Sequence, residues 1–245
     1  MIRRMLLLGL VVAGIAIPAE AFAQAFTLDL GDGSSTTGRM VQLILMMTVL
    51  TLAPSILMMV TSFVRIIVVL SLLRTALGTQ QAPPNVVLTS LALFLTFFIM
   101  TPTGERAWRE GVAPLINGQI TEEQAVERTA KPFHDFMVRH VRENDVALFV
   151  DIAKIEAPAS PEAIPYRVLV PAFLISELRR AFEIGFLLFV PFVIIDMVVA
   201  AVLMSMGMMM MPPAVVALPF KLIFFVLVDG WYLIAGSLVQ SFGGS

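Results

Sequence analysis

The sequence contains no cysteine and few charged residues. Only 14% of its 245 residues are Asp, Glu, Lys or Arg, whereas soluble globular domains carry about 25%. Without cysteine, the chain has no disulfides, thiolate metal sites or cysteine nucleophiles. The net charge of −2 leaves no basic surplus to neutralise phosphates, which argues against a nucleic-acid partner. Since 58% of the residues are hydrophobic and the mean hydropathy is +0.91, the composition argues against a water-soluble enzyme.

Sequence motifs of catalysis and cofactor binding are also lacking. The sequence has no G-x-S-x-G nucleophile turn, no phosphate-binding G-x-x-x-x-G-K-[ST] loop and no H-E-x-x-H zinc motif. The two histidines, His134 and His140, are six residues apart and therefore lie on different faces of a helix. We therefore predict no enzymatic activity, no cofactor and no metal site.

The N-terminus has the pattern of a secretion signal. Arg3 and Arg4 precede an apolar run at residues 5–17, and small residues follow at the expected cleavage positions. We predict a signal peptide at residues 1–23, cleaved between Ala23 and Gln24, and then a short polar segment at 24–39. The alternative is a retained N-terminal anchor.

Long apolar blocks fill most of the remaining chain. They predict an all-α membrane protein with two helical hairpins, whose overlong, kinked helices exceed the ~20 residues that cross a bilayer. Pro54 is expected to kink or divide the first block, and Pro83 and Pro84 to form the turn of the first hairpin. The blocks lie at residues 40–73, 86–100, 171–206 and 214–239, which gives hairpins at 40–100 and 166–240 and a C-terminal tail at 241–245.

The polar segment between the hairpins, residues 101–165, predicts a small helical region. Thr121 and Gln124 have the spacing of a capping box. A second short helix is expected between Asn144 and Lys154, followed by a proline-rich linker. If the mature N-terminus is exported and four helices cross the membrane, this segment faces the periplasm and both hairpin turns face the cytoplasm.

Ionisable residues interrupt the apolar blocks. A charge at the centre of a membrane costs about 2.5–3.5 kcal/mol, so such residues normally face protein or water. One chain with two hairpins offers little interior, and we therefore expect acids of one copy to meet bases of another. Two alternatives are charges near helix ends that reach the membrane surface and a proton relay through the acids. The residues are Arg65, Glu183, Asp196, Lys221 and Asp229.

Methionine is concentrated at the turn of the second hairpin. Six of the sixteen methionines fall within residues 204–211, and Gly207, Pro212 and Pro213 end the helices on either side. Because methionine is flexible and polarizable, a ring of such turns would form a soft apolar constriction that excludes ions. Simple hydrophobic filling and Cu(I) binding by thioethers are the alternatives. The consecutive methionines are Met208, Met209, Met210 and Met211.

Long stretches of the apolar blocks resemble the FliP/SctR family of type III secretion export gates. The stretches are LAPSILMMVTSFVRIIVVLSLLRTALGTQQAPPNVVLTSLALFLTFF at 52–98, PAFLISELRRAFEIGFLLFVPFVIIDMVVAAVLMSMGMMMMPP at 171–213 and ALPFKLIFFVLVDGW at 217–231. Together they cover most of the predicted mature chain.

The resemblance implies a function that composition alone does not indicate. It implies a homo-oligomer, in the family of five copies, that forms with FliQ and FliR the pore through which unfolded flagellar proteins are exported. This gate lies in the flagellar basal body, in the inner membrane, beside other membrane proteins of the export apparatus. The resemblance places the run at 208–211 at the constriction and makes Glu177 and Lys221 inter-subunit contacts. The equivalent subunit of a virulence injectisome, a small-solute channel or transporter, and an assembly scaffold are the alternatives.

Overall fold

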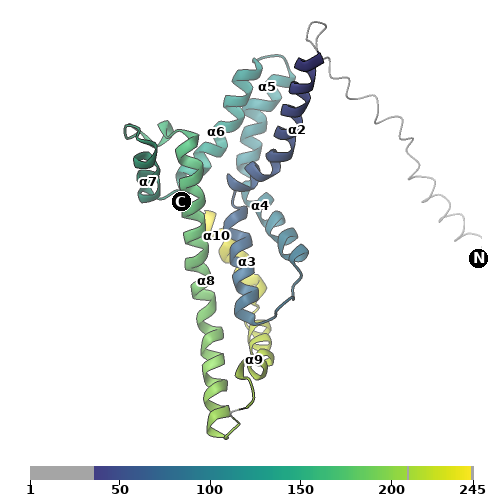
Figure 1. The fold of residues 1–245 in the computed structure, drawn as a ribbon, viewed down its shortest axis with the longest axis vertical. Helices are drawn as coiled ribbons and strands as arrows, with labels where there is room; N and C mark the ends of the chain where they lie inside the picture. The colour runs from purple at the N-terminus through teal and green to yellow at the C-terminus, as the bar shows by residue number, and fades with distance from the viewer. Residues whose placement is uncertain (1–35, 209, 244–245) are drawn as a thin grey trace, which may run out of the picture. The chain divides into compact units, whose positions relative to one another are not determined.

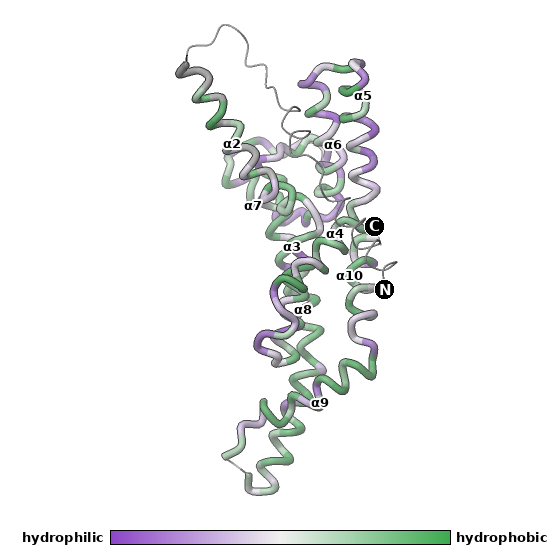
Figure 2. Tube along the Cα trace, turned by 90° about the vertical axis from the view of Figure 1, so that its right-hand side faces the viewer, coloured by the Kyte–Doolittle hydropathy of each residue, from purple (hydrophilic) through white to green (hydrophobic). Residues whose placement is uncertain are grey.

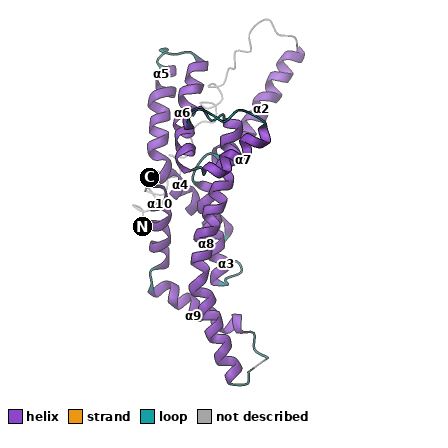
Figure 3. Cartoon of the chain, turned by 90° about the vertical axis from the view of Figure 1, so that its left-hand side faces the viewer, coloured by secondary structure: helices purple, strands orange, loops and turns teal. Residues whose placement is uncertain are grey.

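The computed structural model describes residues 36–208 and 210–243, and every regular element in these two ranges is a helix (Figures 1 and 3). This confirms the predicted all-α class. The predicted signal peptide with its cleavage site at Ala23 and Gln24 lies outside the described residues, as does Met209.

The first apolar block is divided, but not at its proline. Helix α2 (Thr36–Met59) contains Pro54 within it, and the break falls at residues 60–62, before α3 (Phe63–Leu77). The chain divides into two units, and the boundary falls after Leu52, inside α2. The elements from α3 onward belong to the second unit, which is described by itself below.

The predicted turn at Pro83 and Pro84 joins α3 to the next helix. Gly78 ends α3 with a φ of 77°, a left-handed conformation that glycine adopts at little cost. Pro84 immediately precedes the first helical residue of α4. Arg74, in the last turn of α3, donates a hydrogen bond from Nη1 to the carbonyl oxygen of Pro83 at 3.3 Å.

Helix α4 continues well past Met100, where the apolar run was predicted to end. It spans Asn85–Ala107 and leads without interruption into a π-helical turn at Trp108–Val112 (η2) and a short helix α5 (Ala113–Ile116). Its polar continuation packs against α6, so tertiary contact maintains the helix after the hydrophobic pattern has ended.

The polar segment folds into helices, as predicted. Helix α6 (Glu122–His140) begins with the predicted capping box: Thr121 Oγ1 accepts from the backbone N–H of Gln124, whose side chain accepts from the N–H of Thr121. Helix α7 (Glu143–Ala153) and a short 3₁₀ turn η3 (Pro161–Ala163) follow.

The second hairpin consists of one long helix and two shorter ones. Helix α8 (Tyr166–Ser205) has 40 residues and is about 60 Å long at 1.5 Å per residue. The fourth apolar block, 214–239, was predicted as one helix, but the chain bends by 62° between α9 (Pro213–Leu227) and α10 (Gly230–Gly243). Asp229 makes this break with a φ of 51°.

Helices α3 and α8 run side by side and parallel (Figure 1). Arg65 of α3 contacts Glu177 of α8. About two helical turns further along α3, Leu72 lies against Gly185 of α8. The helices approach closely there because Gly185 has no side chain. The main apolar core surrounds this contact and includes Ile66, Val69, Leu70, Leu73, Leu88, Ala92, Ala181, Phe192, Phe225 and Leu238.

Two continuous helices in the described residues are long and apolar enough to cross a membrane, at Asn85–Ile116 and Tyr166–Ser205. The bent pair of α9 and α10 would make a third crossing if it is one span. With 15 residues, α3 is shorter than the ~20 that a span requires.

Figure 2 shows hydrophobic residues along most of α8 and α9. Only 11% of the most apolar window of α8 is buried within the chain. Lipid or other protein must cover the rest, because an exposed apolar surface of this kind marks a membrane or protein interface.

Candidate functional site

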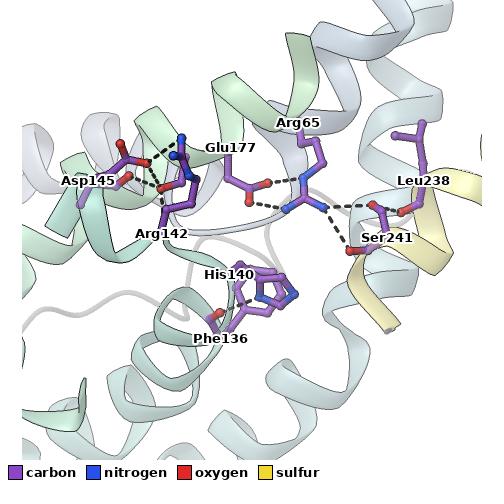
Figure 4. Close-up of polar contacts among 10 residues, drawn as sticks. Arg65, Phe136, His140, Arg142, Asp145, Glu177, Leu238 and Ser241 are labelled. Carbon is purple, nitrogen blue, oxygen red and sulfur yellow. Dashed lines mark hydrogen bonds and ion pairs between the residues drawn. The ribbon is translucent and has the colours of Figure 1, made fainter. Parts of the chain in front are cut away.

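A buried ion pair joins α3, α8 and α10 (Figure 4). Arg65 donates from Nε to Glu177 Oε2 at 2.8 Å and from Nη2 to Oε1 at 2.5 Å, and their side chains are 1% and 0% exposed. Nη1 of Arg65 also donates to Ser241 Oγ at 3.0 Å and to its carbonyl oxygen at 3.2 Å. The guanidinium lies 3.7 Å from the ring centroid of Phe242. One arginine thereby links three helices through four kinds of contact.

A second ion pair joins α3, α8 and α9. Lys221 Nζ lies 2.6 Å from Asp196 Oδ2 and donates to the carbonyl oxygen of Ala76 at 3.2 Å. Ala76 is in the last turn of α3, where the carbonyl groups have no helical partner and attract a cation. The Lys221 side chain is 8% exposed, whereas that of Asp196 is 38% exposed, so the aspartate lies toward the surface.

These two pairs give Arg65, Asp196 and Lys221, three of the five charges that interrupt the apolar blocks, partners within one chain. Glu177 and Lys221, for which the resemblance implies contacts to neighbouring subunits, each have an ion-pair partner in their own chain. The physical reason is that α3 packs along α8 and is closed off by α9 and α10, which gives a single chain an interior that two simple hairpins would lack.

The other two predicted charges lie at the surface. Glu183 forms an exposed pair with Arg179, one helical turn away, with Nε and Oε1 2.9 Å apart. Asp229 is exposed at the bend between α9 and α10. The structure therefore brings together Arg65 with Glu177 and Asp196 with Lys221, but places Glu183 and Asp229 in neither cluster.

The methionine-rich segment forms the turn between α8 and α9. Gly207 has a φ of 76°, its N–H donates to the carbonyl of Met204, and the N–H of Met208 donates to the carbonyl of Leu203. This is the Schellman arrangement, in which a left-handed glycine ends a helix. Pro212 then precedes α9, whose first residue is Pro213, and a proline is well tolerated there because its missing N–H has no partner at that position.

Methionine side chains project from this turn into the surroundings. Met210 is 99% exposed, and Met208 and Met211 are 38% and 42% exposed. An apolar groove of about 630 Å³ lies between α8 and α9 directly beside the turn. It is lined by Ile194, Ile195, Val198, Val199, Val202, Leu203, Met206, Val216, Phe220 and Phe224.

Each of the two histidines has one ring nitrogen within hydrogen-bond distance of a backbone carbonyl oxygen. His134 Nε2 lies 2.8 Å from the carbonyl oxygen of Ile164, and His140 Nδ1 lies 2.8 Å from that of Phe136. Across the described ranges, no group of three or more His, Cys, Asp or Glu side chains has an arrangement that could hold a metal ion.

Sequence reasoning missed two polar contacts of this region. In one of them, Arg65 contacts Ser241 and Phe242, two residues that were predicted to belong to a C-terminal tail. The other is Ser176 Oγ, which accepts from the backbone N–H of Arg142 and lies 2.6 Å from Asp145 Oδ2, thereby fastening the start of α7 to α8. Neither has a local sequence signal, because the partners are more than 30 residues apart.

Comparison with known proteins identifies the family. The family model of the FliP family matches residues 46–238. A flagellar biosynthetic protein FliP from Caulobacter vibrioides is 60% identical over 95% of this chain and 89% of its own length. The FliP protein of Bacillus subtilis is 55% identical over 82% of this chain and 91% of its own length, and that of Agrobacterium fabrum is 48% identical over 93% and 95%. With its candidate membrane-spanning helices, the chain therefore belongs to the FliP family of flagellar biosynthetic proteins, which are components of type III export.

Proposed function

We propose that this chain is the core pore subunit of the flagellar type III export gate. In this proposal, several copies, five by resemblance to the family, assemble with FliQ and FliR around a channel for unfolded flagellar proteins. The observation that carries the proposal is the exposed methionine turn at the end of an α8–α9 hairpin whose apolar surface is largely uncovered.

The uncovered surface of α8 and α9 supports assembly with further protein. Covering the groove beside the turn with a neighbouring helix would bury apolar area, which stabilises association by about 25 cal/mol per Å². The two ion pairs support a rigid subunit, because they fix α9 and α10 against α3 and α8 before any partner binds.

The methionine turn supports a role as a gasket. Side chains at Met208, Met210 and Met211 are exposed, unbranched and apolar, so a ring of them could close on itself and yield to a passing polypeptide. A narrow apolar constriction excludes water and ions by dewetting. Met209 completes the run in the sequence and is part of the proposed gasket.

The proposed location is the inner membrane, within the flagellar basal body. The helical segment at residues 101–165 would face the periplasm after signal-peptide cleavage. The chain would act without enzymatic activity or a cofactor, as a conduit through which other components drive the substrate. The named relatives are flagellar proteins, which favours this system over a virulence injectisome.

An ion-leak measurement tests the gasket. The assembly, purified with its partner subunits, is reconstituted in vesicles, with glycine replacing Met208, Met209, Met210 and Met211. We expect a several-fold increase in ion leak, since glycine leaves the constriction open and wet. The matched control is Met197→Ala, at a methionine that is 67% exposed on α8 but outside the turn, and it should not leak.

The outcomes separate the alternatives. An assembled variant with an unchanged ion barrier would reject the gasket, and unchanged export as well would favour a pure scaffold. Selective passage of a small solute through the wild-type assembly would favour a channel or transporter.

A further inference from the structure

His140 lies at the contact between α6 and the end of α10 (Figure 4). Its residue is 8% exposed, and its ring centroid is 5.2 Å from that of Phe242 and 4.6 Å from that of Phe136. The Phe242 ring in turn stacks on the Arg65 guanidinium. The imidazole and the guanidinium therefore lie on the same aromatic side chain, which fixes the last turn of α10.

One ring nitrogen of His140 has a partner and the other has none. Nδ1 lies 2.8 Å from the carbonyl oxygen of Phe136, an acceptor, so Nδ1 carries the proton of the neutral ring. Nε2 is buried without a hydrogen-bond partner among the described residues. His140 also lines a cavity of about 280 Å³ between α4, α6 and α10, together with Thr103 and Phe242. Nε2 is thus a buried lone pair that can accept a proton.

The charged groups around His140 disfavour that proton while α10 is docked. Arg65 of α3 and Arg139 of α6 both oppose a positive imidazole. Glu177 of α8 would favour one, but both of its oxygens are engaged by Arg65. The cavity walls that α4 and α10 contribute are uncharged: Phe98, Ile99, Pro102, Thr103, Val239, Phe242 and Gly243.

We propose that His140 is a proton-binding site that controls the docking of the last turn of α10. Neutral His140 packs against Phe242 and leaves Ser241 bound to Arg65. A proton on Nε2 places a second cation beside Arg65 in a buried site, and the last turn of α10, residues 238–243, then releases so that the imidazolium reaches water.

The direction of the pH effect follows from the burial of the ring. Burial lowers the pKa of His140 below its ordinary value of 6.5. Arg65 and Arg139 lower the pKa further, and together with burial they outweigh the backbone carbonyls of Phe136 and Phe242, which favour the charged ring. Release returns the pKa to its ordinary value, so release takes up a proton. Docking is therefore complete above pH 6.5 and weakens as the pH falls below it, by up to about tenfold in the docking constant per pH unit.

A spin label on α10 tests the proposal in the full chain in lipid nanodiscs. The chain has no native cysteine, so Gln240→Cys, at an exposed position, gives a single site for the spin label. The labelled sulfur carries no ionisable thiol, so the pH dependence of the label's mobility reports on α10. We expect the mobile fraction to rise several-fold between pH 8 and pH 5.5. His140→Gln should abolish this dependence, whereas the matched control His134→Gln should retain it.

A second measurement keeps the test decisive if a variant does not fold. With only two histidines, selectively labelled imidazoles can be titrated by NMR in the otherwise wild-type chain. We expect one to titrate below pH 6.5 and to move toward 6.5 in Phe242→Ala, while the other stays in place. Three results would each overturn the proposal. The label could be equally immobile at both pH values, the pH response could persist in His140→Gln, or His140 could titrate at or above pH 6.5.

Discussion

Arg65 and Glu177 are 112 residues apart in the sequence and form a two-point ion pair with no exposure to solvent beyond 1%. The stability of such a buried pair depends on its hydrogen-bond geometry. The cost of removing two charges from water is large, and their attraction offsets it only when both oxygens and all facing N–H groups are used. Here Nη1 of Arg65 also donates to the hydroxyl and the carbonyl oxygen of Ser241.

Removing one member of this pair should be more harmful than removing both. Arg65→Met or Glu177→Leu leaves a buried charge without its partner, and we expect a loss of about 3–5 kcal/mol in unfolding free energy. The double variant should recover much of this loss. The measurement is denaturant unfolding in detergent. Arg179→Ala, which breaks the exposed pair with Glu183, is the control and should have little effect. Equal losses in the single and double variants would contradict the prediction.

The close approach of α3 and α8 depends on Gly185. A Cβ at this position would collide with the Leu72 side chain, so Gly185→Ala should destabilise the fold by about 1–3 kcal/mol. Leu72→Ala should relieve the collision, and the double variant should lose less than the sum of the single losses. Gly104→Ala in α4 is the matched control, because its Cβ would meet nothing within 4 Å. The measurement is thermal unfolding of the four variants. If the losses of the two single variants simply added up in the double variant, the result would argue against direct contact between residues 72 and 185.

Single cysteines can test the proposed membrane orientation. Glu123, in the polar segment, and Gln80, in the turn between α3 and α4, are both exposed. In intact cells whose periplasm is accessible, a membrane-impermeant thiol reagent should label Glu123→Cys but not Gln80→Cys. Both should react after membrane permeabilisation, which controls for accessibility. Labelling in the reverse order would overturn the proposed orientation.

The polar segment should lose stability in acid through Asp135. Burial opposes ionisation of this carboxylate, but hydrogen bonds from Lys131 and Arg106 outweigh it and hold the pKa below its ordinary value of 3.8. The unfolded chain therefore binds the proton more readily, so this contribution is present above pH 3.8 and is lost as the pH falls below it. Asp135→Asn should be less stable than wild type at pH 6, and the difference should shrink below pH 3.8. A constant difference across this range would count against the pair.

Features that depend on neighbouring residues could be predicted from the amino-acid sequence. Thr121 and Gln124 begin α6 because their groups satisfy each other locally, and Gly207 with Pro212 ends one helix and begins the next. Hydrophobic runs longer than a bilayer is thick marked the membrane character of the chain, and family-wide residue patterns marked its relatives.

How far the helices extend and which charges pair depend on contacts between distant parts of the chain. Helix α4 continues past Met100 because α6 covers it, and α10 begins after Asp229 because the chain bends there. Arg65 pairs with Glu177, and Lys221 with Asp196, because the packing of α3, α8, α9 and α10 buries Arg65, Glu177 and Lys221, and a buried charge requires a partner. No local pattern encodes those pairings, since the partners are brought together by packing over distances that a helical period does not span.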